Sequence, residues 1–105
     1  MTDLKEASMN FDLQDLEPFL RQMAKKWDGF GPREVETVIA GVRGMAVDDE
    51  KEWRFTLRRN GKDIPFVVRV FLDDADAPDL YVLSAPDVAT QIQADLVAFS
   101  EGLGK

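Results

Sequence analysis

The sequence contains no cysteine and no histidine among its 105 residues. Without cysteine, disulfides, thiolate nucleophiles and thiolate metal sites are excluded. Without histidine, the commonest general base and metal ligand is missing, and neither a Ser–His nor a Cys–His nucleophile can form. The side-chain inventory therefore disfavours an enzyme, and we predict no catalytic residue, no metal site and no cofactor.

Long apolar stretches are also missing. No apolar run approaches the roughly 20 residues that a membrane-spanning helix needs. The first ten residues, MTDLKEASMN, lack the basic and apolar regions of a secretory signal. We therefore expect a cytoplasmic protein that does not contact a membrane.

Positive charge is scarce except in one stretch. The net charge is −7, but residues 51–70 hold six basic and two acidic residues, a local balance of +4. Binding to a phosphate backbone depends on Lys and Arg, so the overall charge makes a nucleic-acid partner an unfavoured interpretation. An acidic body with a basic hairpin suits self-complementary contact or a charged partner, although such asymmetry is more often only a solvated sheet face beside acidic loops. The partner that we expect is another protein.

The rest of the chain is organised around residues 52–73, EWRFTLRRNGKDIPFVVRVFLD. Asn60-Gly61 joins two runs of alternating apolar residues, which is typical of a β-hairpin with a type I′ turn. A two-residue turn fixes the pairing, so that Phe55 faces Phe66 and Thr56 faces Pro65. The predicted cross-strand pairs are Arg59–Lys62, Arg58–Asp63, Leu57–Ile64, Thr56–Pro65, Phe55–Phe66, Arg54–Val67, Trp53–Val68 and Glu52–Arg69.

This register separates the side chains into two faces. One predicted face holds Trp53, Phe55, Leu57, Ile64, Phe66 and Val68. The other holds the charged residues together with Val67 and Phe71, so both faces carry apolar side chains and both need cover. We expect the chain's own helices to provide it, and a homodimer formed through the sheet is the alternative.

Before the hairpin, residues 1–10 show no period, and we predict a flexible tail followed by a single domain over residues 11–105. An apolar stripe from Leu13 to Trp27 predicts a first helix. Pro18 fits the first turn of that helix if Asp15 is its N-cap.

Residues 32–47 are ambiguous. Pro32 and Glu34 are start signals for a helix, and the apolar residues keep helical spacing. Several β-branched residues and two glycines favour a strand instead. We prefer the helix, whereas the strand would add a fourth strand to the sheet.

After the hairpin, an acidic loop over residues 73–79 leads to a short strand at Leu80–Leu83. We interpret the loop as a solvated turn rather than a cation site, because it lacks the glycine and glutamate of an EF-hand loop. The strand should run antiparallel beside the second hairpin strand and end before Pro65, which lacks an N–H to donate. Ser84 then caps the last helix, with Asp87 in its first turn.

These observations predict an α+β fold, an antiparallel meander of three or, with residues 32–47, four strands, with N-terminal and C-terminal helices packed on one face. The function that we expect is a small acidic, non-enzymatic protein-binding module with a regulatory or adaptor role. The alternative is a ligand-binding or anion-binding domain, or an enzyme that uses only Asp, Arg and Tyr groups. Tyr81 is the only tyrosine.

The candidate binding residues are the basic groups of the hairpin: Arg54, Arg58, Arg69, Arg59 and Lys62. Arg54, Arg58 and Arg69 should project from one face, because alternate residues of a strand share a face. A rigid group of this kind suits an acidic partner. The competing interpretation is that Glu52 and Asp63 pair with Arg69 and Arg58 across the strands and that the group binds nothing.

Overall fold

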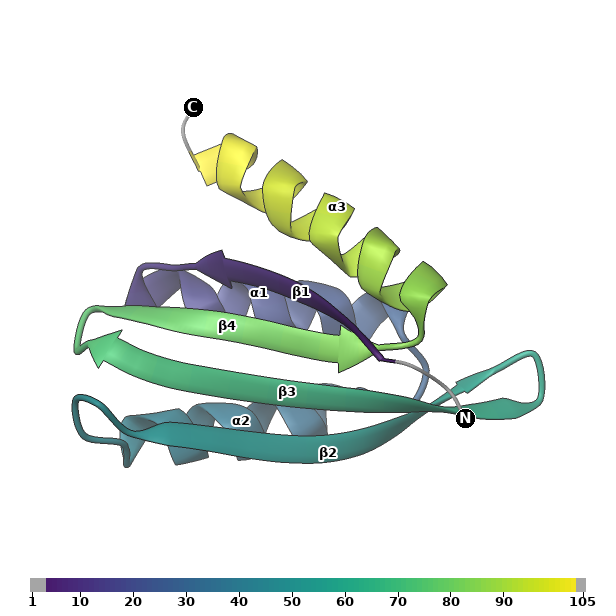
Figure 1. The fold of residues 1–105 in the computed structure, drawn as a ribbon, viewed down its shortest axis with the longest axis horizontal. Helices are drawn as coiled ribbons and strands as arrows, with labels where there is room; N and C mark the ends of the chain where they lie inside the picture. The colour runs from purple at the N-terminus through teal and green to yellow at the C-terminus, as the bar shows by residue number, and fades with distance from the viewer. Residues whose placement is uncertain (1–3, 104–105) are drawn as a thin grey trace.

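The computed structural model describes residues 4–103 and has the element order β-α-α-β-β-β-α (Figure 1). The elements are β1 (Lys5–Asn10), α1 (Leu13–Lys26), α2 (Pro32–Arg43), β2 (Glu50–Arg59), β3 (Lys62–Asp74), β4 (Ala77–Ser84) and α3 (Pro86–Leu103). The four strands form one antiparallel sheet in the order β1-β4-β3-β2. The fold is therefore α+β, with a four-stranded sheet.

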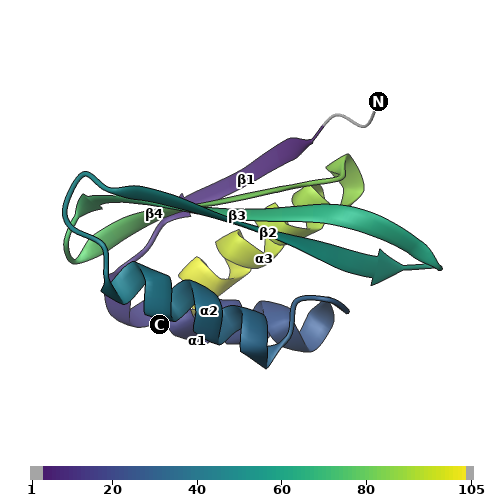
Figure 2. The same cartoon turned by 90° about the horizontal axis from the view of Figure 1, so that it is seen from below.

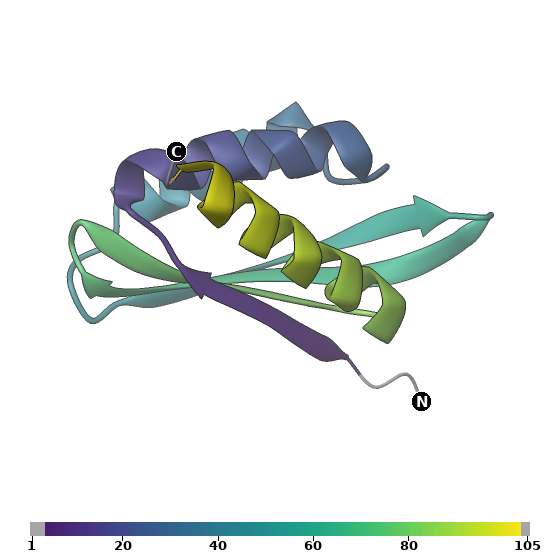
Figure 3. The same ribbon diagram turned by 90° about the horizontal axis from the view of Figure 1, so that it is seen from above.

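All three helices lie on the same side of the sheet (Figures 2 and 3). The helix-facing side chains of the central strands, such as Phe66, Val68 and Val82, are fully buried. They pack with Phe19 of α1 and Ile92 of α3 into one hydrophobic core. The molecule thus has two layers, and the predicted packing of the N-terminal and C-terminal helices on one face is confirmed. Our expectation that the chain's own helices would also cover the other face is wrong.

The predicted hairpin register is confirmed at every pair from Glu52–Arg69 to Arg59–Lys62. Asn60 and Gly61 both have positive φ, 53° and 75°, as a type I′ turn requires. The core contact of the facing pair Phe55 and Phe66 is made through a third ring. Phe30 lies 5.4 Å from Phe55 and 5.1 Å from Phe66 between ring centroids.

The third strand of the predicted meander is β4, which pairs with β3 and ends at the Phe66–Ser84 pair, one residue short of Pro65. Its placement and its end confirm the prediction. The role assigned to Ser84 is wrong, because this residue is the last of β4 and is fully buried. Its hydroxyl donates to the Pro65 carbonyl oxygen at 2.7 Å, a group that has no strand partner there, and it does not cap α3.

The fourth strand is β1, so residues 5–10 are not the flexible tail that we predicted, while residues 1–3 lie outside the described residues. The strand pairs along its whole length with β4 and buries Ala7 completely. On its outer edge, the Gln93 side chain of α3 accepts from the Ser8 N–H at 3.0 Å. Pairing on one side and α3 on the other hold this segment in place.

For the two N-terminal helices, the prediction of α2 is confirmed and the predicted start of α1 is wrong. Residues 32–43 form α2, with Glu34 accepting the Gly31 N–H at 2.8 Å, so the helix that we preferred is confirmed. The start predicted for α1 is wrong, because its N-cap is Asp12 and Pro18 lies inside the helix.

Tertiary contacts fix this early start of α1. The Phe11 and Leu13 N–H groups donate to carbonyl oxygens of Pro78 and Asp76 in and beside the β3–β4 turn, at 3.0 and 2.8 Å. Leu16 is fully buried in the first turns of the helix. These contacts offset the hydrogen bond that Pro18 cannot make.

Candidate functional site

The side of the sheet opposite the helices, which we call the open face, is the candidate functional site. Its side chains follow from the strand register. They are Leu4 and, from β1, Glu6, Ser8 and Asn10; from β4, Asp79, Tyr81 and Leu83; from β3, Asp63, Pro65, Val67, Arg69 and Phe71; and from β2, Glu50, Glu52, Arg54, Thr56 and Arg58.

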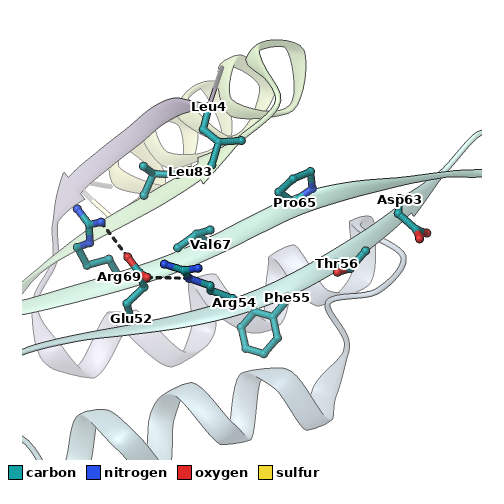
Figure 4. A pocket seen from close by; sticks show the side chains of 10 residues that line it. All are labelled: Leu4, Glu52, Arg54, Phe55, Thr56, Asp63, Pro65, Val67, Arg69 and Leu83. Atoms are coloured by element: carbon teal, nitrogen blue, oxygen red, sulfur yellow. Dashed lines mark hydrogen bonds and ion pairs between the residues drawn. The ribbon is translucent and has the colours of Figure 1, made fainter. Parts of the chain in front are cut away.

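A line of apolar groups crosses the middle of this face. Val67, Phe71 and Leu83 are half-buried against their neighbours in the sheet, and Leu4 is 40% exposed. Four of the apolar residues, Leu4, Pro65, Val67 and Leu83, line a shallow hollow of about 510 Å³ (Figure 4). No element within the described residues covers this apolar line.

A carboxylate at the border of the hollow binds two arginines at once (Figure 4). Glu52 accepts from Arg69 Nη2 at 2.8 Å through Oε1 and from Arg54 Nε at 3.0 Å through Oε2. Arg69 also lies 3.9 Å from Glu50. The hydrogen bond from Arg69, followed by that from Arg54, lowers the pKa of Glu52, and the Glu52 hydrogen bond raises the pKa of Arg69. Both groups are therefore held in their charged forms.

The third predicted arginine of this face has a partner as well. Arg58 Nη1 donates to Asp63 Oδ1 at 2.9 Å, with both side chains about two-thirds exposed (64% and 63%). The structure thus brings Arg54, Arg58 and Arg69 onto one face, as the alternation requires, and gives each of them a carboxylate. Their availability for an external anion is reduced accordingly.

The other two predicted binding residues do not belong to the open face. Arg59 turns towards the helices, where its Nη1 lies 2.6 Å from Asp87 Oδ2 and its guanidinium lies 5.9 Å from the centre of the Trp27 ring. Lys62 pairs with Arg59 in the register and alternates with Asp63, so it projects to the same side as Arg59. The predicted basic group is therefore split between two sides of the hairpin.

Leu4, Glu6 and Leu83 of the open face were missed by sequence reasoning, and Tyr81 was named only as a group of the alternative function. Leu4 and Glu6 were assigned to a flexible tail. The signal for a strand was present, because Ala7, Met9 and Phe11 alternate with polar residues, but this run of alternation is too short to stand out. Tyr81 and Leu83 were predicted to lie in a strand, but their side chains were not assigned to either face of the sheet.

Tyr81 has the third shifted pKa of this face. Partial burial raises the pKa of its phenol, and the nearby carboxylates of Asp79, Glu6 and Glu50 raise it further. None of the three shifts on the open face moves a group towards neutrality, where a general acid or base works best. Among residues 4–103, no three acidic side chains come together in a way that could hold a metal ion.

The fold and this face define a two-layer α+β protein with one uncovered, partly apolar sheet surface. The chain matches no protein-family model, no curated protein and no solved structure. Among the residues that the structure describes, no helix is long and apolar enough to cross a lipid bilayer.

Proposed function

We propose that the protein is a small non-enzymatic binding module with a regulatory or adaptor role, and that its open face binds another protein. The observation that supports this most directly is the placement of all three helices on one side of the sheet. Antiparallel sheets commonly leave one face to solvent, but that face is then mainly polar. Here it carries Val67, Tyr81 and Leu83 in its centre and Phe71 in the row at its end.

The arrangement of side chains on the open face resembles the anatomy of protein interfaces. Such interfaces have a partly apolar centre enriched in aromatic residues and arginine, and a polar rim. The open face has Tyr81 near its centre, Phe71 on the central strand β3 towards one end, and Glu52, Arg54 and Arg58 along the β2 side. Because each of these arginines has a carboxylate partner, the rim that a bound protein would contact consists of ion pairs rather than of unpaired positive charges.

The alternative function, an anion-binding domain or an enzyme that uses Asp, Arg and Tyr groups, has less support. Arg54, Arg58 and Arg69 are all engaged by Glu52 or Asp63. The pKa of Glu52 is lowered and that of Tyr81 is raised, so neither supplies a group that exchanges protons near neutral pH. The hollow on the open face is shallow, whereas small-molecule sites are clefts or cavities that bury most of the ligand.

A comparison of two apolar-to-acidic substitutions tests this proposal. Leu83→Asp places a charge in the centre of the open face, while Val97→Asp does the same on the outer side of α3, where Val97 is already 42% exposed. Immobilised wild-type protein and both variants are incubated with native extract, and retained molecules are identified by mass spectrometry. We expect a protein that the wild type and Val97→Asp retain in stoichiometric amount and that Leu83→Asp loses.

Thermal unfolding of both variants shows whether they fold. If Leu83→Asp does not fold, Val67→Lys is a second test of the same surface. Retention of the same partner by all open-face variants would mean that binding occurs elsewhere. A small molecule that co-purifies in place of a protein would support the alternative function.

A further inference from the structure

We propose that the segment which docks on the open face is an apolar protein segment with flanking Lys or Arg side chains, and that these cations lie over the β1–β4 half of the face, around Tyr81. This inference deepens the proposed function and rests on it. It reverses the polarity that the basic hairpin suggests, because the charges left without partners on this face are negative.

The charge of the open face follows from its register. Three guanidinium groups face five carboxylates, those of Glu6, Glu50, Glu52, Asp63 and Asp79, which gives a net charge of −2. The arginines are matched by Glu52 and Asp63, as described above. Within residues 4–103, Glu6 and Asp79 have no basic side chain within ion-pair distance. Asp79 accepts one hydrogen bond, from Asn10 Nδ2 at 2.8 Å.

These two carboxylates stand on either side of an aromatic ring. Asp79 lies two residues before Tyr81 on β4, on the same face. Glu6 lies on the neighbouring strand β1, where it pairs with Leu83 and is therefore a diagonal neighbour of Tyr81. A half-buried aromatic ring with carboxylates beside it suits a Lys or Arg side chain, which gains both ion pairing and cation–π attraction. Burial is the main cause of the raised pKa of Tyr81, and the carboxylates of Asp79, Glu6 and Glu50 raise it further.

The partner is expected to cover the face of the sheet rather than to extend it with another strand. On the β1 edge, Gln93 accepts from the Ser8 N–H. On the β2 edge, the Arg58 N–H donates to the Asp28 carbonyl at 2.9 Å. The first half of this strand carries the charged residues Glu50, Lys51, Glu52 and Arg54, which oppose pairing with another strand. Both edges are thus partly closed by the protein itself.

Charge also decides against a second copy as the occupant. Two open faces of net charge −2, on chains of net charge −7, repel each other. Four strands about 4.8 Å apart, with about nine residues each on average, give a face of roughly 600 Å². That is below the roughly 800 Å² per partner of a standard interface, so a weak, exchanging complex is expected.

The test uses two short synthetic peptides that share the same leucine positions and carry either Lys or Glu at all others. Each is titrated into ¹⁵N-labelled protein at low salt, with inorganic phosphate as a third probe. We expect the Lys peptide to bind at least about tenfold more tightly than the Glu peptide and to shift amide signals of β1 and β4 around Tyr81. Neutralising both unpaired carboxylates, Glu6→Gln with Asp79→Asn, should weaken that binding about fivefold.

The matched control is Glu36→Gln with Glu101→Gln, which removes the same charge from α2 and α3, on the other side of the sheet, and should leave the affinity within about twofold. Equal weakening by the control, or shifts spread over all acidic segments, would show only general attraction to an acidic protein and would overturn the inference. Tighter binding of the Glu peptide or of phosphate at Arg54 and Arg58 would overturn it as well, and so would no binding of the Lys peptide.

The same experiment separates this inference from the proposed function. If the Glu peptide binds the open face and Leu83→Asp abolishes its binding, the face binds proteins but prefers acidic segments. That outcome would support the proposed function and overturn this inference. If peptides bind but Leu83→Asp changes nothing, the face itself is not the binding surface. Sedimentation equilibrium of the wild type adds one more outcome, since a dimer broken by Leu83→Asp would identify a second copy as the occupant and refute the basic segment.

Discussion

Replacement of Gly29 by alanine should destabilise the protein far more than the same replacement at Gly61. Both glycines have positive φ, 106° and 75°. A Cβ on Gly29 would clash with the Thr56 carbonyl oxygen and lie 2.9 Å from the Leu57 Cα, which are backbone atoms of β2. A Cβ on Gly61 would meet nothing within 4 Å. The two sites therefore share the conformational cost and differ in packing.

The magnitudes follow from these two terms. An alanine at positive φ costs about 1–2 kcal/mol, which is the whole expected effect at Gly61. At Gly29 the larger φ adds strain, and the displaced loop must move away from β2, so we expect a total of about 3–5 kcal/mol. The loop also supplies the Asp28 carbonyl that accepts the Arg58 N–H, and this bond should be lost.

Urea unfolding followed by far-UV circular dichroism measures both free energies. An unchanged m-value would show that unfolding exposes a similar amount of surface in each variant. A Gly29→Ala variant within about 1 kcal/mol of Gly61→Ala would refute the close approach of this loop to the edge of β2.

Three further predictions concern the core and the open face. Phe66→Ala should cost about 3–5 kcal/mol because this ring is fully buried, and Phe55→Ala about half as much because its ring is half-buried; equal costs in urea unfolding would contradict the assigned environments. Tyr81 is the only tyrosine, so its ultraviolet absorbance titration should give a pKa above the ordinary value of about 10. The free energy of unfolding should fall as the pH rises from that value through the folded-state pKa, because the unfolded chain loses the proton first. A midpoint at or below about 10 in the folded protein would disprove this. Glu52 has a lowered pKa, so its contribution to stability is present above the ordinary glutamate pKa and is lost as the pH falls through the folded-state pKa. Glu52→Gln should therefore flatten the dependence of stability on pH between about pH 5 and pH 2. An unchanged dependence would show that the Arg69 and Arg54 contacts are weak in solution.

The distribution of charges on the hairpin illustrates how far composition can mislead about a site. Residues 51–70 are basic as a segment, yet two of their arginines, Arg54 and Arg69, share one carboxylate of the same segment, and Arg58 takes the other. Reversing the charge of Arg54 and Arg58 together should therefore leave the binding of an apolar, basic segment intact. Loss of that binding in Arg54→Glu with Arg58→Glu, with an unchanged melting temperature, would restore the arginines as the recognition surface.

The sequence by itself determined the β2–β3 hairpin, its register and the strand that follows it. Asn60-Gly61 sets a turn whose geometry depends on two adjacent residues, and the alternation of side chains then fixes every pair. The end of β4 before Pro65 follows in the same way, because the missing N–H is a property of one residue. These features are local, so a single sequence suffices for them.

Only the tertiary structure decided what happens at Lys5–Asn10, at Pro18 and at Ser84. Residues 5–10 become a strand because β4 offers an edge and α3 offers Gln93, groups about 70 to 90 residues away along the chain. The early start of α1 depends on carbonyl oxygens of the β3–β4 turn, and Ser84 meets Pro65 rather than the start of α3. The uncovered open face has the same origin, because no pattern within a helix records which side of a distant sheet it will cover.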